Sequence, residues 1–181
     1  MTAENQGAPH SAVDAVWAEL ASRTVRVILA RQGVGYAQLA KSLASRGVAE
    51  SARSVEGKIQ RGTFRFVFLL QVVSATRAVC PANWASVSSC DSWEARATAV
   101  LDADLAEQRW IDVKELSRRL GTIGVAMSAR VLRQQIRRGT FTAALYLQCA
   151  TVCRFDGVFL FVDPEAMRRT AEAGMACLER F

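Results

Sequence analysis

Histidine is almost missing from this chain, because its 181 residues include only His10, which lies in a polar N-terminal segment. A Ser-His or Cys-His catalytic pair is therefore not expected. The sequence also has no Walker loop and no G-x-G-x-x-G segment, and its acidic residues are scattered without a paired motif. We expect a protein that is not an enzyme and that binds no cofactor.

Cysteine occurs in an odd number, and no two cysteines have the C-x-x-C spacing. A zinc site needs four good ligands, and these cysteines with the single histidine do not supply such a set. We expect no metal site and interpret the cysteines as reduced, mostly buried thiols of a cytosolic protein. They are Cys80, Cys90, Cys149, Cys153 and Cys177.

Long apolar runs are missing as well. No run approaches the ~20 residues that a transmembrane helix requires, and the N-terminal segment has neither the basic nor the apolar part of a signal peptide. We expect a cytoplasmic protein without a membrane partner. With only 3 prolines and 11 glycines, and with many alanines, leucines, arginines and glutamines, the composition predicts an all-α fold.

An internal repeat organises the chain. When the sequence is shifted by 77 residues, 39–71 aligns without a gap with 116–148, and 15 of the 33 positions are identical. The identical positions include an R-G-T-F segment at 61–64 and again at 138–141. One fold unit is therefore used twice in tandem.

The apolar spacing predicts the same series of helices in each unit. In the first unit we expect helices at about 12–32, 36–47, 52–61 and 64–77, with Thr63 as the cap of the last one. The tryptophans expected inside the helical bundles are Trp17, Trp93 and Trp110.

The repeat divides the chain into five predicted parts. They are a disordered tail at 1–11, a first helix-turn-helix-like domain at 12–77, a linker at 78–91, a second helix-turn-helix-like domain at 92–155, and a C-terminal strand-helix element at 156–181. Trp84, in the linker, has no obvious place in either bundle.

The C-terminal element has two possible roles. The run G-V-F-L-F-V at 157–162 is typical of a short strand, and Asp163-Pro164-Glu165 predicts the start of a helix that continues to about residue 180. A lone strand needs a partner. Residues 156–181 could form a homodimer through the same strand of a second chain, or pack on the second unit as an extended plug.

Positive charge is concentrated in the repeated segments. The chain carries a net charge of +6 and a pI near 9.5. Residues 36–64 have five Lys and Arg against two acids, net +3, and residues 110–141 have seven against two, net +5. The remainder therefore sums to −2. Two matched basic segments are typical of a nucleic-acid footprint.

The order of short helix, turn, helix, glycine and apolar helix is that of helix-turn-helix DNA readers. If Val55 and Ile59 face inward, helical geometry turns a polar set outward. In the first unit this set is Arg53, Ser54, Gly57, Gln60 and Arg61, flanked by Lys58. In the second unit it is Arg130, Val131, Gln134, Arg137 and Arg138, flanked by Arg133 and Gln135.

These side chains suit a DNA groove, since arginine binds guanine edges and phosphates and glutamine binds adenine edges. The simpler interpretation is an ordinary solvent-facing surface on a helical scaffold. Two matched clusters on the most basic segments favour double-stranded DNA. The Gly and Phe of R-G-T-F are interpreted as structural, as a helix end and a core residue.

The matched units resemble a bacterial family of short helical domains catalogued as a domain of unknown function. Its members read approximately Y-x-x-L-A-x-x-L, a Gly-Val turn, N-K-I-x-R-G-x-F and an aromatic stretch ending in L-Q-C. The first unit matches at Tyr36, Leu39, Ala40, Leu43, Gly47, Val48, Lys58, Ile59, Arg61, Gly62, Phe64, Phe68 and Gln71. The second matches at Leu116, Leu120, Gly124, Val125, Ile136, Arg138, Gly139, Phe141, Leu147, Gln148 and Cys149.

The resemblance implies a fold similar in outline to phage-repressor-type helix-turn-helix domains, with a turn about three residues longer. This chain departs from the family at two positions that could contact bases. The family's lysine is Gln135 in the second unit, and its asparagine is Gly57 in the first and Gln134 in the second. The family has no settled activity, so DNA binding is inferred from architecture.

We therefore expect a DNA-binding transcriptional regulator with two recognition helices in one chain. The alternatives are a protein-interaction adaptor or antitoxin-like module, and a structural protein that binds DNA without sequence preference. Salt separates DNA binding from a protein interface, because phosphate contacts make affinity fall steeply as salt rises.

Overall fold

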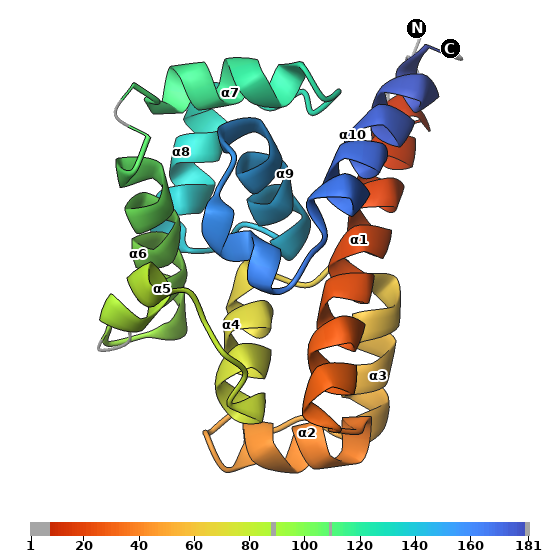
Figure 1. Ribbon diagram of the computed structural model, residues 1–181, viewed down its shortest axis with the longest axis vertical. Coiled ribbons are helices and arrows are strands. Elements are labelled where there is room, and N and C mark those ends of the chain that lie inside the picture. Colours follow the sequence, from red (N-terminus) through yellow and green to blue (C-terminus); the bar gives the residue numbers. More distant parts are fainter. Residues whose placement is uncertain (1–7, 88–89, 109, 180–181) are drawn as a thin grey trace, which may run out of the picture.

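The computed structural model describes residues 8–87, 90–108 and 110–179. In these ranges the chain is helical, and it contains no strand beyond one isolated bridge. The helices are α1 (Ala8–Gln32), α2 (Tyr36–Ala44), α3 (Ala52–Arg61), α4 (Phe66–Thr76), α5 (Ala82–Ser86), α6 (Trp93–Ala106), α7 (Val113–Gly121), α8 (Ala129–Arg138), α9 (Ala143–Cys153), the 3₁₀-helix η1 (Asp156–Leu160) and α10 (Pro164–Leu178) (Figure 1). The all-α prediction is thus confirmed for the described residues.

The repeated helices form where their apolar residues share one face. In α3, Val55 and Ile59 are buried, and the helix has the predicted bounds of 52–61. Gly62 ends it in the left-handed conformation, with φ near +68°. The next helix, α4, starts at Phe66 rather than at residue 64, and its N-cap is Arg65, so the predicted capping role of Thr63 is wrong.

The later start of α4 has a structural cause. Arg65 lies opposite Thr142 in an antiparallel bridge. The N–H of Phe66 donates to the carbonyl of Phe141, and the N–H of Ala143 donates to the carbonyl of Phe64, each at 3.0 Å. The backbone after each R-G-T-F segment is therefore extended, and the two units are hydrogen-bonded to each other there.

Helices of each unit also pack against helices of the other unit. Helix α1 packs against α9 of the second unit, while α6 packs against α4 of the first, and α4 and α9 contact each other. In Figure 1, α1 and α6 lie on opposite sides of the molecule, as do α2 and α7. The chain thus has one shared core, in which the Phe66 ring stacks on Phe141 with centroids 5.4 Å apart.

The segment between the units takes part in this core. Helix α5 places Trp84 in a fully buried position against Phe66, Tyr146 and Phe161. Trp17 is buried and Trp93 is partly buried, as predicted. Trp110 is 88% exposed, so its predicted place inside a bundle is wrong. Its side chain belongs to the short connection between α6 and α7.

The predicted strand at 157–162 is wrong. The segment is η1 and the turn after it, with Phe161 N–H donating to the Val158 carbonyl at 2.9 Å. Val158, Phe161 and Val162 are buried while Phe159 and Leu160 are exposed, which is the spacing of a helical turn and not of a strand. Because backbone groups of this segment form hydrogen bonds within the helical turn, the segment does not need a partner strand.

The predicted helix after this run is confirmed. The Asp163 side chain accepts a hydrogen bond from the N–H of Glu165, and α10 begins at Pro164. Met167 and Ala171 are buried, and α10 lies along α1, where its apolar stripe is covered within the same chain (Figure 1).

Three further expectations concern the whole chain. Of the tail predicted at 1–11, residues 1–7 lie outside the described part, and α1 already begins at Ala8. Among the described residues, no helix has the length and apolarity needed to cross a membrane. Cys149 and Cys153 are buried free thiols, whereas Cys80, Cys90 and Cys177 are half-buried.

Candidate nucleic-acid interface

Helix α8 is built to hold one polar face outward. The Ser128 side chain caps it by accepting a hydrogen bond from the N–H of Val131 at 3.3 Å. Leu132 and Ile136 are buried on the inner face. The carbonyl of Ile136 also accepts a 2.6 Å hydrogen bond from Thr98 Oγ1 of α6, which fixes the C-terminal end of α8 against that helix.

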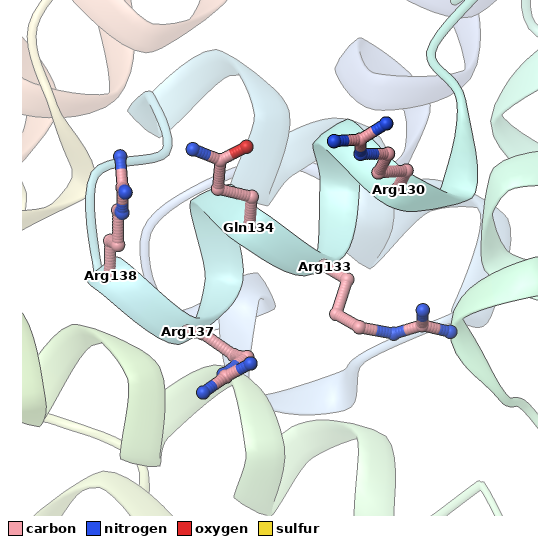
Figure 2. Close-up of a pocket in the computed structure, with 5 residues that line it drawn as sticks. All are labelled: Arg130, Arg133, Gln134, Arg137 and Arg138. Carbon is pink, nitrogen blue, oxygen red and sulfur yellow. The ribbon is translucent and has the colours of Figure 1, made fainter.

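The outer face of α8 carries four arginines and one glutamine. Figure 2 shows them in two rows, with Arg130, Gln134 and Arg138 on one side of the helix and Arg133 and Arg137 on the other. They line an open depression of about 390 Å³. All five side chains are exposed.

The positive charge on this face is not neutralised by any residue of the described ranges. Among the described residues, none of the four guanidinium groups bonds to a carboxylate. Arg133 and Arg137 are like charges at i and i+4, an arrangement that destabilises a helix by ~0.2–0.5 kcal/mol. An anionic partner would remove this repulsion.

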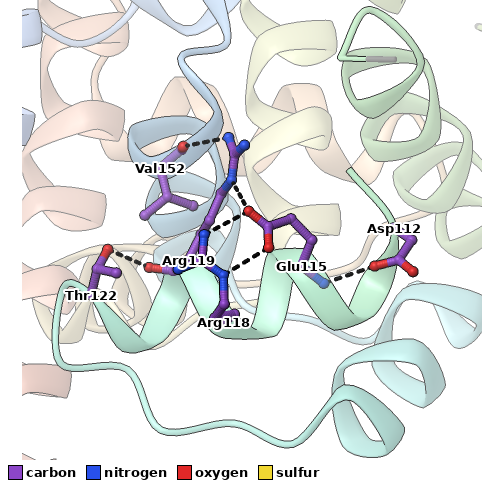
Figure 3. A network of polar contacts seen from close by, with 6 residues as sticks. All are labelled: Asp112, Glu115, Arg118, Arg119, Thr122 and Val152. Atoms are coloured by element: carbon purple, nitrogen blue, oxygen red, sulfur yellow. Dashed lines mark hydrogen bonds and ion pairs between the residues drawn. The ribbon is translucent and has the colours of Figure 1, made fainter. Parts of the chain in front are cut away.

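The neighbouring helix α7 shows the opposite arrangement (Figure 3). Glu115 accepts hydrogen bonds from Arg118 and Arg119, each at 2.8 Å, and Arg119 also reaches the Val152 carbonyl. Hydrogen bonds from the two guanidinium groups lower the pKa of Glu115 to about 2. The arginines of α7 therefore stabilise the fold locally, while those of α8 remain available.

Helix α3, the counterpart of α8, has a partly neutralised face. Lys58 forms an ion pair with Glu50 and lies over the Phe68 ring, 4.8 Å from its centroid. The Ser54 hydroxyl donates to the same carboxylate at 3.0 Å. Gln60 donates to Glu56 of its own helix at 3.1 Å.

The predicted site residues thus fall into three groups. The exposed ones without a side-chain partner among the described residues are Arg53, Arg61, Arg130, Arg133, Gln134, Arg137 and Arg138. Exposed but bonded within the first unit are Ser54 and Gln60. Half-buried are Lys58 and Gln135. Gln135 lines a groove with Gly62 and Gln148 instead of joining the outer face of α8.

Comparison with protein families matches two segments of the chain, residues 17–79 and 93–158, to the family described as Domain of unknown function (DUF6471). The chain belongs to this family. It contains two copies of the domain in tandem, which confirms the resemblance seen in the sequence. No curated protein and no solved structure matches the chain.

Each DUF6471 copy begins at an equivalent tryptophan, Trp17 in α1 and Trp93 in α6, and ends after its last core helix. Helix α5 and helix α10 lie outside both copies. Helices α3 and α8 are therefore the same element of the DUF6471 domain, with different surfaces.

One candidate residue escaped the sequence prediction. Arg65 is exposed and lines a groove of about 390 Å³ with Lys58, Arg61, Phe68 and Gln71. The prediction considered only helical faces, and Arg65 lies just beyond α3 in the extended bridge. The available signal was its place directly after R-G-T-F, where the second copy has the uncharged Thr142.

Proposed function

We propose that this protein binds double-stranded DNA and regulates transcription, with α8 as the principal contact helix and α3 as a weaker one. In each copy the helix pair, α2–α3 or α7–α8, would act as a helix-turn-helix motif with a seven-residue connection. The observation that carries the proposal is the face of α8, where four exposed arginines and Gln134 have no acidic partner among the described residues.

The residue types fit the proposed ligand. Arginine forms paired hydrogen bonds with guanine edges and ion pairs with phosphate, and glutamine forms paired hydrogen bonds with adenine. A helix of ten residues, about 15 Å long, fits the major groove with one face toward the bases. Two rows of side chains, such as those of α8, allow one row to contact bases while the other contacts phosphates.

The test compares three triple variants in fluorescence-anisotropy titrations with duplex DNA at two salt concentrations. The first removes Arg130, Arg137 and Arg138 from α8 by substitution with alanine. The second makes the equivalent changes in α3, at Arg53, Gln60 and Arg61. The third substitutes Arg26, Arg168 and Arg169, which are ion-paired on α1 and α10, and removes as much charge as the first.

We expect the α8 variant to lose the most affinity, at ~1–3 kcal/mol for each base contact removed. Each lost phosphate contact should make the slope of log K against log salt shallower by about 0.9. The α3 variant should lose less, and the α1/α10 variant least. Circular dichroism checks that each variant is folded. Equal binding by the folded α8 variant contradicts the proposal, and absence of binding by the wild type favours a protein-interaction adaptor.

A further inference from the structure

The two DUF6471 copies are joined through equivalent positions. Arg65 and Thr142 are 77 residues apart, the spacing of the repeat, and they face each other in the antiparallel bridge. The flanking hydrogen bonds, Phe66 to Phe141 and Ala143 to Phe64, are likewise equivalent, and both are 3.0 Å long. When a residue pairs antiparallel with its own equivalent, the two copies are related by a local two-fold axis through the pair.

The helix contacts between the two copies obey the same axis. The contact of α1 with α9 has its counterpart in that of α6 with α4, and α4 contacts its own equivalent α9. Figure 1 looks nearly along the axis, since α1 and α6, α2 and α7, and α4 and α9 exchange places across the centre of the view. The chain is arranged as a symmetric dimer would be, within one polypeptide.

This symmetry determines how α3 and α8 are presented. Helix α3 lies behind α1 in Figure 1, and a two-fold axis along the view places α8 at the same depth. Both helices are therefore on one side of the molecule. Their C-terminal ends lie near the axis, because Arg61 and Arg138 each precede the bridge residue by only four positions.

The chain length limits the separation of the two ends. Four residues span at most about 14 Å, and the paired backbones are about 4.5 Å apart at such a bridge. The Cα atoms of Arg61 and Arg138 are therefore no more than roughly 33 Å apart. This upper limit is about one turn of the duplex, so both ends can reach the half-sites of a helix-turn-helix dimer, whose centres are one turn apart.

We propose that one chain binds an inverted repeat whose two half-sites are unequal, an inference that rests on the proposed DNA binding. The two-fold axis of the protein coincides with the local two-fold axis of the duplex, so the half-sites run in opposite directions. The half-site under α8 is the more strictly defined one. The half-site under α3 is less strictly defined, because Lys58 and Gln60 are bonded there to Glu50 and Glu56. A tandem duplication would otherwise be expected to select a direct repeat.

The experiment begins with selection from a library of random duplexes by the full chain. The enriched sequence supplies three duplexes for anisotropy titrations: the selected site, the same site with one half-site reversed into a direct repeat, and the same site with the α3 half-site scrambled. Sedimentation measures how many chains bind one duplex. The α3 variant with Arg53, Gln60 and Arg61 replaced by alanine is titrated in parallel.

We expect one chain per duplex, and a loss of about fivefold or more on reversal or scrambling, since each mismatched pair costs ~1–3 kcal/mol. The α3 variant should not distinguish the selected site from the scrambled one. Binding to all three duplexes with equal affinity, a selected direct repeat, or two chains on one site overturns the inference and leaves DNA binding intact. Absence of binding to any duplex overturns both proposals.

Discussion

Helices α3 and α8 occupy equivalent places in the two DUF6471 copies, and their inner faces are more alike than their outer faces, which share Arg53 with Arg130 and Arg61 with Arg138. Val55 and Ile59 of α3 correspond to Leu132 and Ile136 of α8, and all four are buried. The outer faces differ most at Glu56, whose counterpart is Arg133. Packing restrains the inner face, because a buried change of volume or polarity costs several kcal/mol, whereas exposed positions change at little cost.

Among the interior positions that differ between the copies, one carries a carboxylate in the second copy and an aliphatic side chain in the first. When the copies are aligned from Trp17 and Trp93, the buried Ile28 of α1 corresponds to the buried Asp104 of α6. Asp104 accepts hydrogen bonds from Tyr146 at 2.7 Å and from Trp84 and Asn83 of α5. The second copy thus anchors the linker through a buried carboxylate, where the first has an aliphatic contact.

The largest effect on stability is expected where both copies agree. A Cβ atom at Gly62 would lie 1.8 Å from the Ala18 carbonyl oxygen, and at Gly139 it would lie 2.1 Å from that of Glu94. Both glycines also have positive φ. We expect Gly62→Ala and Gly139→Ala each to lower the free energy of unfolding by about 3 kcal/mol or more, measured by urea denaturation.

Gly47→Ala is the matched control for these variants. Gly47 also has a positive φ, near +80°, but no atom lies within 4 Å of its added Cβ. Only the backbone strain of about 1–2 kcal/mol should appear. If Gly62→Ala or Gly139→Ala lowers the free energy of unfolding no more than Gly47→Ala does, then α1 does not approach Gly62, or α6 does not approach Gly139, as closely as the structure shows.

The second prediction converts the surface of α3 toward that of α8. The double variant Glu50→Met, Glu56→Arg introduces the residues found at the equivalent positions, Met127 and Arg133. It frees Lys58 from its ion pair and adds a cation to α3. We expect DNA affinity to rise several-fold at low salt, with a salt slope steeper by about one to two.

The reciprocal variant, Met127→Glu with Arg133→Glu, should weaken binding and make the slope shallower. Thermal unfolding in the absence of DNA shows whether either variant disturbs the fold. An unchanged salt slope in both variants would mean that these acidic residues do not set the difference between the two copies.

The third prediction concerns pH and the buried carboxylate of the second copy. Burial raises the pKa of Asp104, against the hydrogen bonds that favour the charged form. The folded protein then holds this proton at pH values where the unfolded chain has released it. The contribution of Asp104 to stability therefore falls as pH rises above its unfolded pKa of about 4.

Asp104→Asn removes this titration. Its melting temperature relative to the wild type should improve as pH rises from about 4 to 7, with circular dichroism as the measurement. A difference between the two proteins that stays constant over this range would show that Asp104 has an ordinary pKa in the folded state.

Much of the fold could be predicted because its signals are local. Apolar spacing and a following glycine were enough to place α3, and the Asp-Pro-Glu sequence placed the start of α10. The strand at 157–162 was predicted wrongly because a short apolar run does not distinguish a strand from a helical turn. The exposure of Trp110 and the bridge between Arg65 and Thr142 depend on contacts between distant segments.

The candidate site could be predicted only in part, for the same reason. Helical geometry was sufficient to place Arg130, Gln134 and Arg137 on an exposed face. It could not show that Glu50, in the loop before α3, would neutralise Lys58. That contact depends on how the loop folds back on the helix.

The smallest expected effect comes from the ion pairs of α7. Glu115 corresponds to Gln38 of α2, and Arg119 corresponds to Ser42, so the first copy lacks this network. Because the pKa of Glu115 is lowered to about 2, its stabilising contribution is present at neutral pH, falls as pH drops below the unfolded value near 4.5, and is lost near pH 2.

Glu115→Gln should therefore lower the melting temperature slightly at pH 7, and this deficit should disappear near pH 2 and also in 1 M salt, where exposed charges are screened. Gln38→Glu, which places a carboxylate three residues before Lys41 in α2, should raise the melting temperature by a similarly small amount at pH 7. Differential scanning calorimetry of both variants measures the two shifts. If Glu115→Gln destabilises the protein equally at both pH values, the ion pairs do not stabilise α7. The difference between α7 and α2 then comes from the N-cap, which is Asp112 in α7 and Gly35, without a side-chain hydrogen bond, in α2.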